Sequence, residues 1–146
     1  MKTIITNVDN LRIPPSTKNF SIDGDPKLAC TCGNELCDRR AIKQWVLNKV
    51  QLMRDDANRP FQINSGGRCI HHPNEIKRVA AGRQGDHQKC VVVDIKINGI
   101  AEAAELATLA GRYGATAVAI SLELGFIHCA WRELLKNDWR VRVWSY

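Results

Sequence analysis

One stretch near the middle of the chain, residues 67–97, limits what this protein can be more than any other. It reads GRCIHHPNEIKRVAAGRQGDHQKCVVVDIKI and holds three of the four histidines and two of the six cysteines. Its last segment, CVVVDIKI, is rich in β-branched residues, which predicts a strand inside a sheet. Asp94 lies within that strand, and a bare carboxylate is costly to bury. Asp94 is therefore turned to solvent on an edge strand, satisfied by backbone hydrogen bonds, or paired with a cation or a metal.

The remaining pattern predicts an α+β fold. Apolar residues recur at helical spacing in two long segments, and Asn98 is a plausible cap for the second. Helices are predicted at 38–57, 74–82 and 99–114. Strands are predicted at 59–66, 90–97, 115–124, 125–134 and 139–146. We expect a single domain over residues 1–146, with an irregular segment at 1–29 and a core at 30–146. That core is a mainly antiparallel sheet with helices packed on one side.

Composition narrows the class of partner. The net charge of +6 favours anionic partners such as nucleic acid, anionic lipid or acidic wall polymers. The basic residues are scattered, so we expect no nucleic acid partner. No apolar segment reaches the ~20 residues that span a membrane. The first 20 residues lack the pattern of a signal peptide, so we expect synthesis in a reducing cytoplasm.

The segment CTCGNELC places Cys30, Cys32 and Cys37 in one tight turn. In a reducing compartment such cysteines are more often thiols or metal ligands than disulfides. Together with Cys69, or with His72 as the fourth ligand, they form a possible second metal site. The C-x-C-x4-C spacing is not that of a standard zinc finger, so reduced thiols packed under a loop remain the alternative. Either way, we expect Cys69 to lie near the turn.

Two histidines and one aspartate form the main candidate for chemistry. His87 precedes the valine-rich strand that contains Asp94, and His128 lies in the predicted strand GFIHCAWREL. A lone histidine on a strand is more often structural than a ligand. Two imidazoles and one carboxylate, however, are a normal set for a catalytic zinc with an open position. The spacing alone leaves open whether the three side chains converge.

Three separated segments resemble the zinc D-alanyl-D-alanine carboxypeptidase family, which shares its fold with the hedgehog signalling domain. The family pattern S-G-x-R is matched at Ser65, Gly66 and Arg68. The pattern S-x-H-x-x-G-x-A-x-D is matched at His87 and Asp94, with the right separation. Cys69 and His72 also fit the R-C-P-x-H-N pattern of many members. Gly85, Cys90 and Val92 stand where the second pattern has serine, glycine and alanine.

The third matching segment lies near the end of the chain. One branch of the family carries E-F-G-x-W-V-H, and ELGFIH here supplies Glu123, Gly125 and His128, one residue shorter. The resemblance covers residues 28–132. It implies a hedgehog/DD-peptidase-like fold in which His87, Asp94 and His128 bind Zn2+ and leave one position for an activated water.

The resemblance also implies roles for the residues around the metal. Glu123 would be the general base, although a salt bridge at a strand end is its alternative role. Arg68 would hold a substrate carboxylate or polarise the scissile carbonyl, and its alternative is a surface arginine after a glycine turn. Ser65 would join substrate binding. Apart from the resemblance, Trp131 is most simply a packing residue, and the alternative is that it lines a substrate groove.

The function implied is that of a zinc metallopeptidase that hydrolyses peptidoglycan stem peptides, as a carboxypeptidase or an endopeptidase. The rival from another class is a non-catalytic zinc-binding module on the same fold, with a wall-binding or virion structural role. Small size and the missing signal peptide favour a phage-type, endolysin-like protein. It would act at the cell wall after holin-assisted export, or be carried in a virion.

Overall fold

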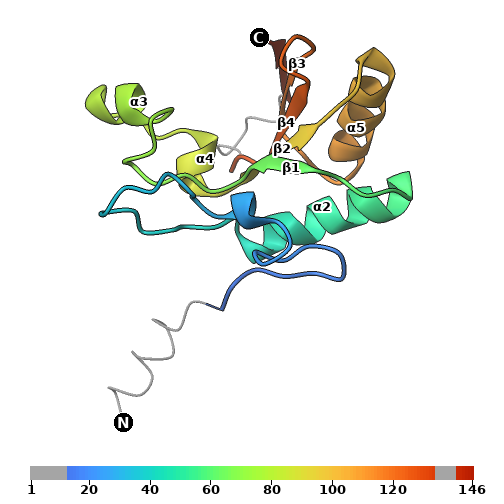
Figure 1. Cartoon of the computed structure of the whole chain (residues 1–146). Coiled ribbons are helices and arrows are strands. Elements are labelled where there is room, and N and C mark those ends of the chain that lie inside the picture. The colour runs from blue at the N-terminus through green and yellow to red at the C-terminus, as the bar shows by residue number, and fades with distance from the viewer. Residues whose placement is uncertain (1–12, 134–140) are drawn as a thin grey trace.

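A five-stranded sheet forms the centre of the computed structural model, which describes residues 13–133 and 141–146 (Figure 1). The strands are β1 (Ile63–Ser65), β2 (Val92–Lys96), β3 (Ala117–Ser121), β4 (Phe126–Ala130) and β5 (Arg142–Ser145). Their order in the sheet is β1-β2-β4-β3-β5. All neighbouring pairs are antiparallel except β3 and β5, which run parallel. The predicted α+β class with a mainly antiparallel sheet is confirmed.

Two long helices cover one face of this sheet (Figure 1). The helical elements are η1 (Pro26–Leu28), α2 (Gln44–Ala57), α3 (Ile76–Ala80), α4 (Asp86–Lys89) and α5 (Ile100–Arg112). In α2 the buried side chains Val46, Val50 and Met53 recur at intervals of three and four residues, so one helical face is apolar. These residues and the buried face of α5 pack against the sheet in one continuous core.

Alternation along β2 and β4 separates this core from the opposite face of the sheet. Val93 and Ile95 of β2 and Ile127 of β4 are buried in the core with α2 and α5. Because successive strand residues face opposite sides, Asp94 and His128 lie on the other face. Asp94 is the direct cross-strand partner of His128. The sheet therefore carries a polar pair on the face that the long helices leave uncovered.

Several local predictions need correction. The N-cap of α5 is Gly99, with φ of 93°, and not Asn98, whose backbone N–H instead donates to the Glu102 carboxylate at 2.8 Å. Helix α2 begins at Gln44, six residues later than predicted at 38. Trp45, which the helical spacing of apolar residues in 38–57 places on the buried face, is 47% exposed and lies outside the core. These differences arise at element ends, where local contacts compete most evenly.

The described part of the irregular N-terminal segment, residues 13–29, packs closely against the rest of the chain. From residue 13 onward it holds η1 and an isolated bridge between Ser16 and Ser21. Phe20 and Leu28 are buried in the main core. The predictions at residues 1–12 and 134–140, including Trp139, lie outside the described residues.

Gly66 and Gly67 allow the segment before Arg68 to pack against the backbone at Leu28 and at Arg40. A Cβ on Gly66 would lie 2.7 Å from the Leu28 carbonyl oxygen, and one on Gly67 would lie 2.3 Å from the Arg40 carbonyl oxygen. The Gly67 N–H donates to the Leu28 carbonyl at 3.0 Å. Only glycine allows this approach, so the two glycines fix where the chain places Arg68.

We expect Gly67→Ala to lower the free energy of unfolding by about 1–3 kcal/mol, because the added Cβ forces backbone apart in a packed region. Gly111→Ala is the matched control, because Gly111 lies in α5 where an added Cβ would meet no neighbouring atom within 4 Å. That control should raise stability by about 0.5–1 kcal/mol. Urea unfolding measures both, and equal stability of Gly67→Ala and wild type would contradict the close approach.

Candidate active site

The three residues predicted as metal ligands come together on the uncovered face of the sheet. His87 comes from α4, Asp94 from β2 and His128 from β4. One ligand atom from each lies within 4.8 Å of the other two. All three side chains are buried. His87 lies in the short helix α4, and not in the loop that the sequence predicts.

The Asp94 carboxylate lies between the two imidazoles. His87 Nε2 is 3.2 Å from Asp94 Oδ2, and His128 Nδ1 is 3.0 Å from Asp94 Oδ1. Ligand atoms at 2.0–2.2 Å from a tetrahedral zinc lie roughly 3.3–3.6 Å from one another. The observed separations are close to that range, so the donor set fits a zinc ion with small adjustments.

Each imidazole is fixed by a partner on its outer nitrogen. His87 Nδ1 lies 2.7 Å from the Gly66 carbonyl oxygen, to which a ring N–H donates. His128 Nε2 lies 3.0 Å from Asp86 Oδ2. In the metal-free site the inner nitrogens donate to Asp94; with a metal bound, the inner nitrogen of each ring would instead offer its lone pair to the ion while the outer nitrogen keeps its hydrogen bond. Metal-binding histidines typically donate their outer ring N–H to a carboxylate or carbonyl oxygen, which fixes the ring while the inner nitrogen binds the metal.

Asp86 is itself held by Arg132. The guanidinium donates from Nε and Nη2 to the two carboxylate oxygens, both at 2.9 Å. Neither residue was predicted from the sequence. Asp86 immediately precedes His87, but Arg132 is 46 residues away, and no spacing rule connects them. The signal that the sequence offered for Asp86 was its position directly before His87, a candidate ligand.

The charges of the site in its metal-free form follow from these contacts. Burial opposes ionisation of Asp94, but hydrogen bonds from His128 and His87 outweigh it and lower its pKa to about 2. Burial likewise opposes ionisation of Asp86, and His128 and Arg132 hold its pKa well below the usual value. For His128, burial disfavours the charged ring, yet Asp86 and Asp94 raise its pKa above the ordinary value. Two ionised carboxylates thus favour a cation here.

Arg68 lies beside the ligand group. Its Nε donates to Ser65 Oγ at 3.0 Å, and its Nη1 donates to Glu75 Oε2 at 3.3 Å. Its Nη2 lies 3.7 Å from Asp94 Oδ2. Glu75, which no sequence pattern singled out, is 1% exposed and also accepts from Gln88. These contacts hold the guanidinium in one orientation next to the metal ligands.

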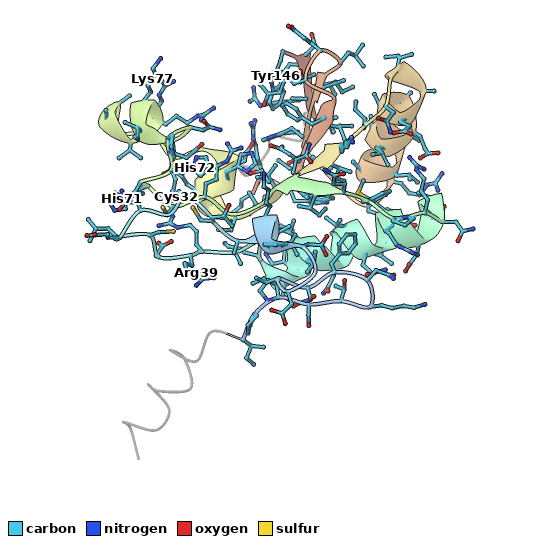
Figure 2. All side chains as sticks on the ribbon, in the orientation of Figure 1. Cys32, Arg39, His71, His72, Lys77 and Tyr146 are labelled. Atoms are coloured by element: carbon cyan, nitrogen blue, oxygen red, sulfur yellow. The ribbon has the colours of Figure 1, made fainter. Side chains whose placement is uncertain are left out.

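The group lies in a wide cleft of about 2160 Å³. This volume exceeds the 300–1,000 Å³ typical of small-ligand pockets and suits an extended chain. Figure 2 shows Lys77 on α3 at the upper left and Tyr146 at the end of the sheet near the top centre, and both line the cleft. Among residues 13–133 and 141–146, seven lysines and arginines line it against four acidic residues. The basic residues are Lys43, Arg68, Lys77, Arg78, Lys89, Arg132 and Arg142, and the acidic ones are Glu75, Asp86, Asp94 and Glu133.

Two other predicted site residues lie differently. Glu123 is exposed in the turn between β3 and β4, which closes at Gly125 with φ of 72°, and it is not among the cleft-lining residues. The structure therefore does not bring Glu123 together with the ligands. Trp131 is 3% exposed and packs in the core, where its indole N–H donates to the Tyr113 carbonyl at 3.0 Å. An edge of Trp131 reaches the cleft, and its role in substrate binding stays a prediction.

The four predicted cysteines also come together. Cys30, Cys32, Cys37 and Cys69 each place a sulfur within 4.8 Å of the other three. Cys69 thus lies near the cysteine turn, as expected from the sequence. His72, the alternative fourth ligand, is not part of this group.

Comparison with known proteins assigns the chain to a family. The family model described as Peptidase M15 matches residues 18–130, most of the chain. The chain belongs to the peptidase M15 family. Its members are zinc metallopeptidases that act on peptide substrates, and the matched region contains all three candidate zinc ligands and Arg68. A search of curated proteins finds no match.

The assignment agrees with one unusual backbone position in this peptidase. Cys90 has φ of 61° and ends α4 in the left-handed conformation that favours glycine. The family pattern has glycine at this position. The turn that presents His87 is therefore preserved although the residue differs.

Among the described residues, no helix is long and apolar enough to cross a membrane.

Replacing Asp86 with Asn tests the outer contact of His128. The amide keeps the shape but loses the negative charge that supports the imidazole, so we expect zinc affinity to fall about 10–100-fold. Competition with a fluorescent chelator measures the affinity. Asp56→Asn is the control, because Asp56 also pairs with an arginine, Arg112, but outside the cleft. Unchanged affinity in Asp86→Asn would show that Asp86 does not support the ligand.

Proposed function

We propose that this M15 peptidase hydrolyses peptidoglycan stem peptides, as a D-Ala-D-Ala-type carboxypeptidase or as an endopeptidase. The position of Arg68 is the observation that carries the proposal. Its guanidinium is held by Ser65 and Glu75 and lies 3.7 Å from the ligand Asp94. A fixed guanidinium binds a carboxylate through two parallel hydrogen bonds. Stem peptides offer such carboxylates close to their scissile bonds.

The charge of the cleft supports an acidic substrate. Three of its four acidic side chains, Glu75, Asp86 and Asp94, are already engaged by arginine or histidine. Seven basic side chains share the same surface. The resulting positive potential raises the local concentration of an anionic polymer such as the cell wall.

The chain's own residues account for most of the hydrolysis. His87, Asp94 and His128 would hold zinc, which when bound supplies Lewis acidity toward water and the scissile carbonyl. Arg68 would hold the substrate carboxylate and so align the peptide bond. A general base would take a proton from the attacking water as the new C–O bond forms. The same group would pass that proton to the leaving amine as the C–N bond breaks.

Two carboxylates compete for the role of general base. Glu123 follows from the family pattern, but it lies outside the cleft-lining residues. Glu133 lines the cleft, follows Arg132 directly, and is exposed. Within the described residues it is the one cleft carboxylate that no arginine or histidine engages. These observations support Glu133 over Glu123.

The place of action is part of the proposal. We propose a phage-type protein that acts at the cell wall or within a virion, where the basic cleft would meet the anionic wall polymer. The second candidate is a non-catalytic zinc-binding wall module on the same fold, which would follow if neither Glu133 nor Glu123 acts as a base.

Glu133→Gln should cut the kcat for wall peptides by about 10²–10⁴-fold with zinc content unchanged, because the amide cannot accept a proton. Glu123→Gln is the matched comparison and should keep near wild-type kcat. Mass spectrometry of products from peptidoglycan of several wall types measures both. A loss in Glu123→Gln alone would transfer the role to Glu123. No cleavage of any wall by zinc-loaded wild type would overturn the proposed substrate and favour the non-catalytic module.

Arg68→Lys should raise the KM for a peptide with a free carboxylate about tenfold or more, because an ammonium cannot form the bidentate contact. Zinc content should stay at the wild-type level, since Arg68 is not a ligand. The same substrate with an amidated carboxyl group is the control and should show little difference between variant and wild type. Equal effects on both substrates would assign Arg68 a purely structural role.

A further inference from the structure

A second cluster of potential ligands lies apart from the cleft ligands and has no role in the proposed hydrolysis. Cys30 and Cys69 are buried, and Cys32 and Cys37 are half-buried. Three come from the loop at 30–37, and Cys69 comes from the segment after Arg68. All four sulfurs lie within 4.8 Å of one another, and the Sγ atoms of Cys32 and Cys69 are 3.6 Å apart. Figure 2 shows Cys32 in its loop, with His72 nearby in the view.

The separations match a metal site better than disulfides. Thiolates at about 2.3 Å from a tetrahedral zinc lie roughly 3.8 Å from one another. Disulfides would bring sulfurs to about 2.05 Å in separate pairs. None of the chain's six cysteines, all of which lie in the described residues, forms a disulfide. Four sulfurs within 4.8 Å of one another are the donor set of a structural zinc.

The backbone of the cysteine loop is folded around the sulfurs. The Arg39 N–H donates to Cys37 Sγ at 3.3 Å. The turn after Cys32 uses Gly33 with φ of 75°, and the turn after Cys37 uses Arg39 with φ of 55°.

We infer that Cys30, Cys32, Cys37 and Cys69 form a structural tetrathiolate zinc site, separate from the His87–Asp94–His128 group. Closed sites with four cysteine ligands are structural, because no coordination position is left for water or substrate. The ligand is a soft or borderline divalent cation, and Zn2+ is the natural occupant. The site therefore contributes to folding and positioning.

The position of the site indicates what it holds in place. Cys69 follows Arg68 directly, and the Gly67 N–H bonds to Leu28 while the Cys30 N–H bonds to Arg40. The metal would cross-link the loop at 30–40 to the segment that carries Arg68. This restricts Arg68 at the edge of the cleft. The expected effect on substrate affinity rests on the proposed function, whereas the expected metal content does not.

Metal stoichiometry tests the site directly on the full chain purified under reducing conditions. We expect two zinc ions per wild-type chain and one in His87→Ala. A double variant, Cys32→Ser with Cys37→Ser, should also hold one. Cys90→Ser is the matched control, because Cys90 is a buried cysteine outside the group, and it should keep two.

Two measurements on wild type avoid the risk that the cysteine variants fail to fold. Reconstitution with Co2+ should give an intense thiolate-to-cobalt charge-transfer absorption, and titration with a mercurial should release one metal ion after about four thiols react. One zinc per chain with these four thiols freely reactive, or disulfides among them, would overturn the inference.

The effect on Arg68 has its own readout. Partial mercurial release of the tetrathiolate metal should raise KM more than it lowers kcat, while the other zinc stays bound. Absence of any wall cleavage would sink the proposed function but leave the stoichiometry and the cobalt spectrum to decide the site.

Discussion

The Asp94 carboxylate, shared by the imidazoles of His87 and His128, is the interaction on which the rest of the site depends. It is buried on an interior strand, where an unpaired charge would be strongly destabilising. Its partners lie within 3.2 Å, and both are fixed from outside by Gly66 and Asp86. A buried charge of this kind is stable only when the surrounding chain is organised around it, or when a metal joins it.

Arginine–carboxylate contacts extend this organisation outward on two sides. On one side Arg132 holds Asp86, which holds His128. On the other side Arg68 contacts Asp94 and Glu75. The Arg132–Asp86 pair acts through the candidate ligand His128 and would therefore affect metal binding. The Arg68 contacts hold its guanidinium beside the cleft, where it can bind a substrate carboxylate. Arginine–carboxylate contacts therefore support the metal ligands on one side and substrate recognition on the other.

The two faces of the sheet have different roles. One face packs against α2 and α5 and supplies the apolar core, while the other carries the ligand group and the cleft. Rigid strands position Asp94 and His128, but His87 and Arg68 come from a short helix and a loop segment. These less regular segments need other supports, which the glycine contacts at Gly66 and Gly67 and the cysteine cluster provide.

The sequence by itself determined the two long helices and the five strands, because hydrophobic periodicity is a local property. It singled out His87, Asp94 and His128 as candidate ligands from residue type and family resemblance, and the four cysteines from residue type and spacing. It did not determine which distant side chains meet. The pairing of Arg132 with Asp86 and the position of Glu123 outside the cleft were decided only by the tertiary structure. The physical reason is that alternation along a strand specifies which face a residue occupies, whereas its neighbours there depend on strand register and turn geometry, which the packing of the whole sheet sets.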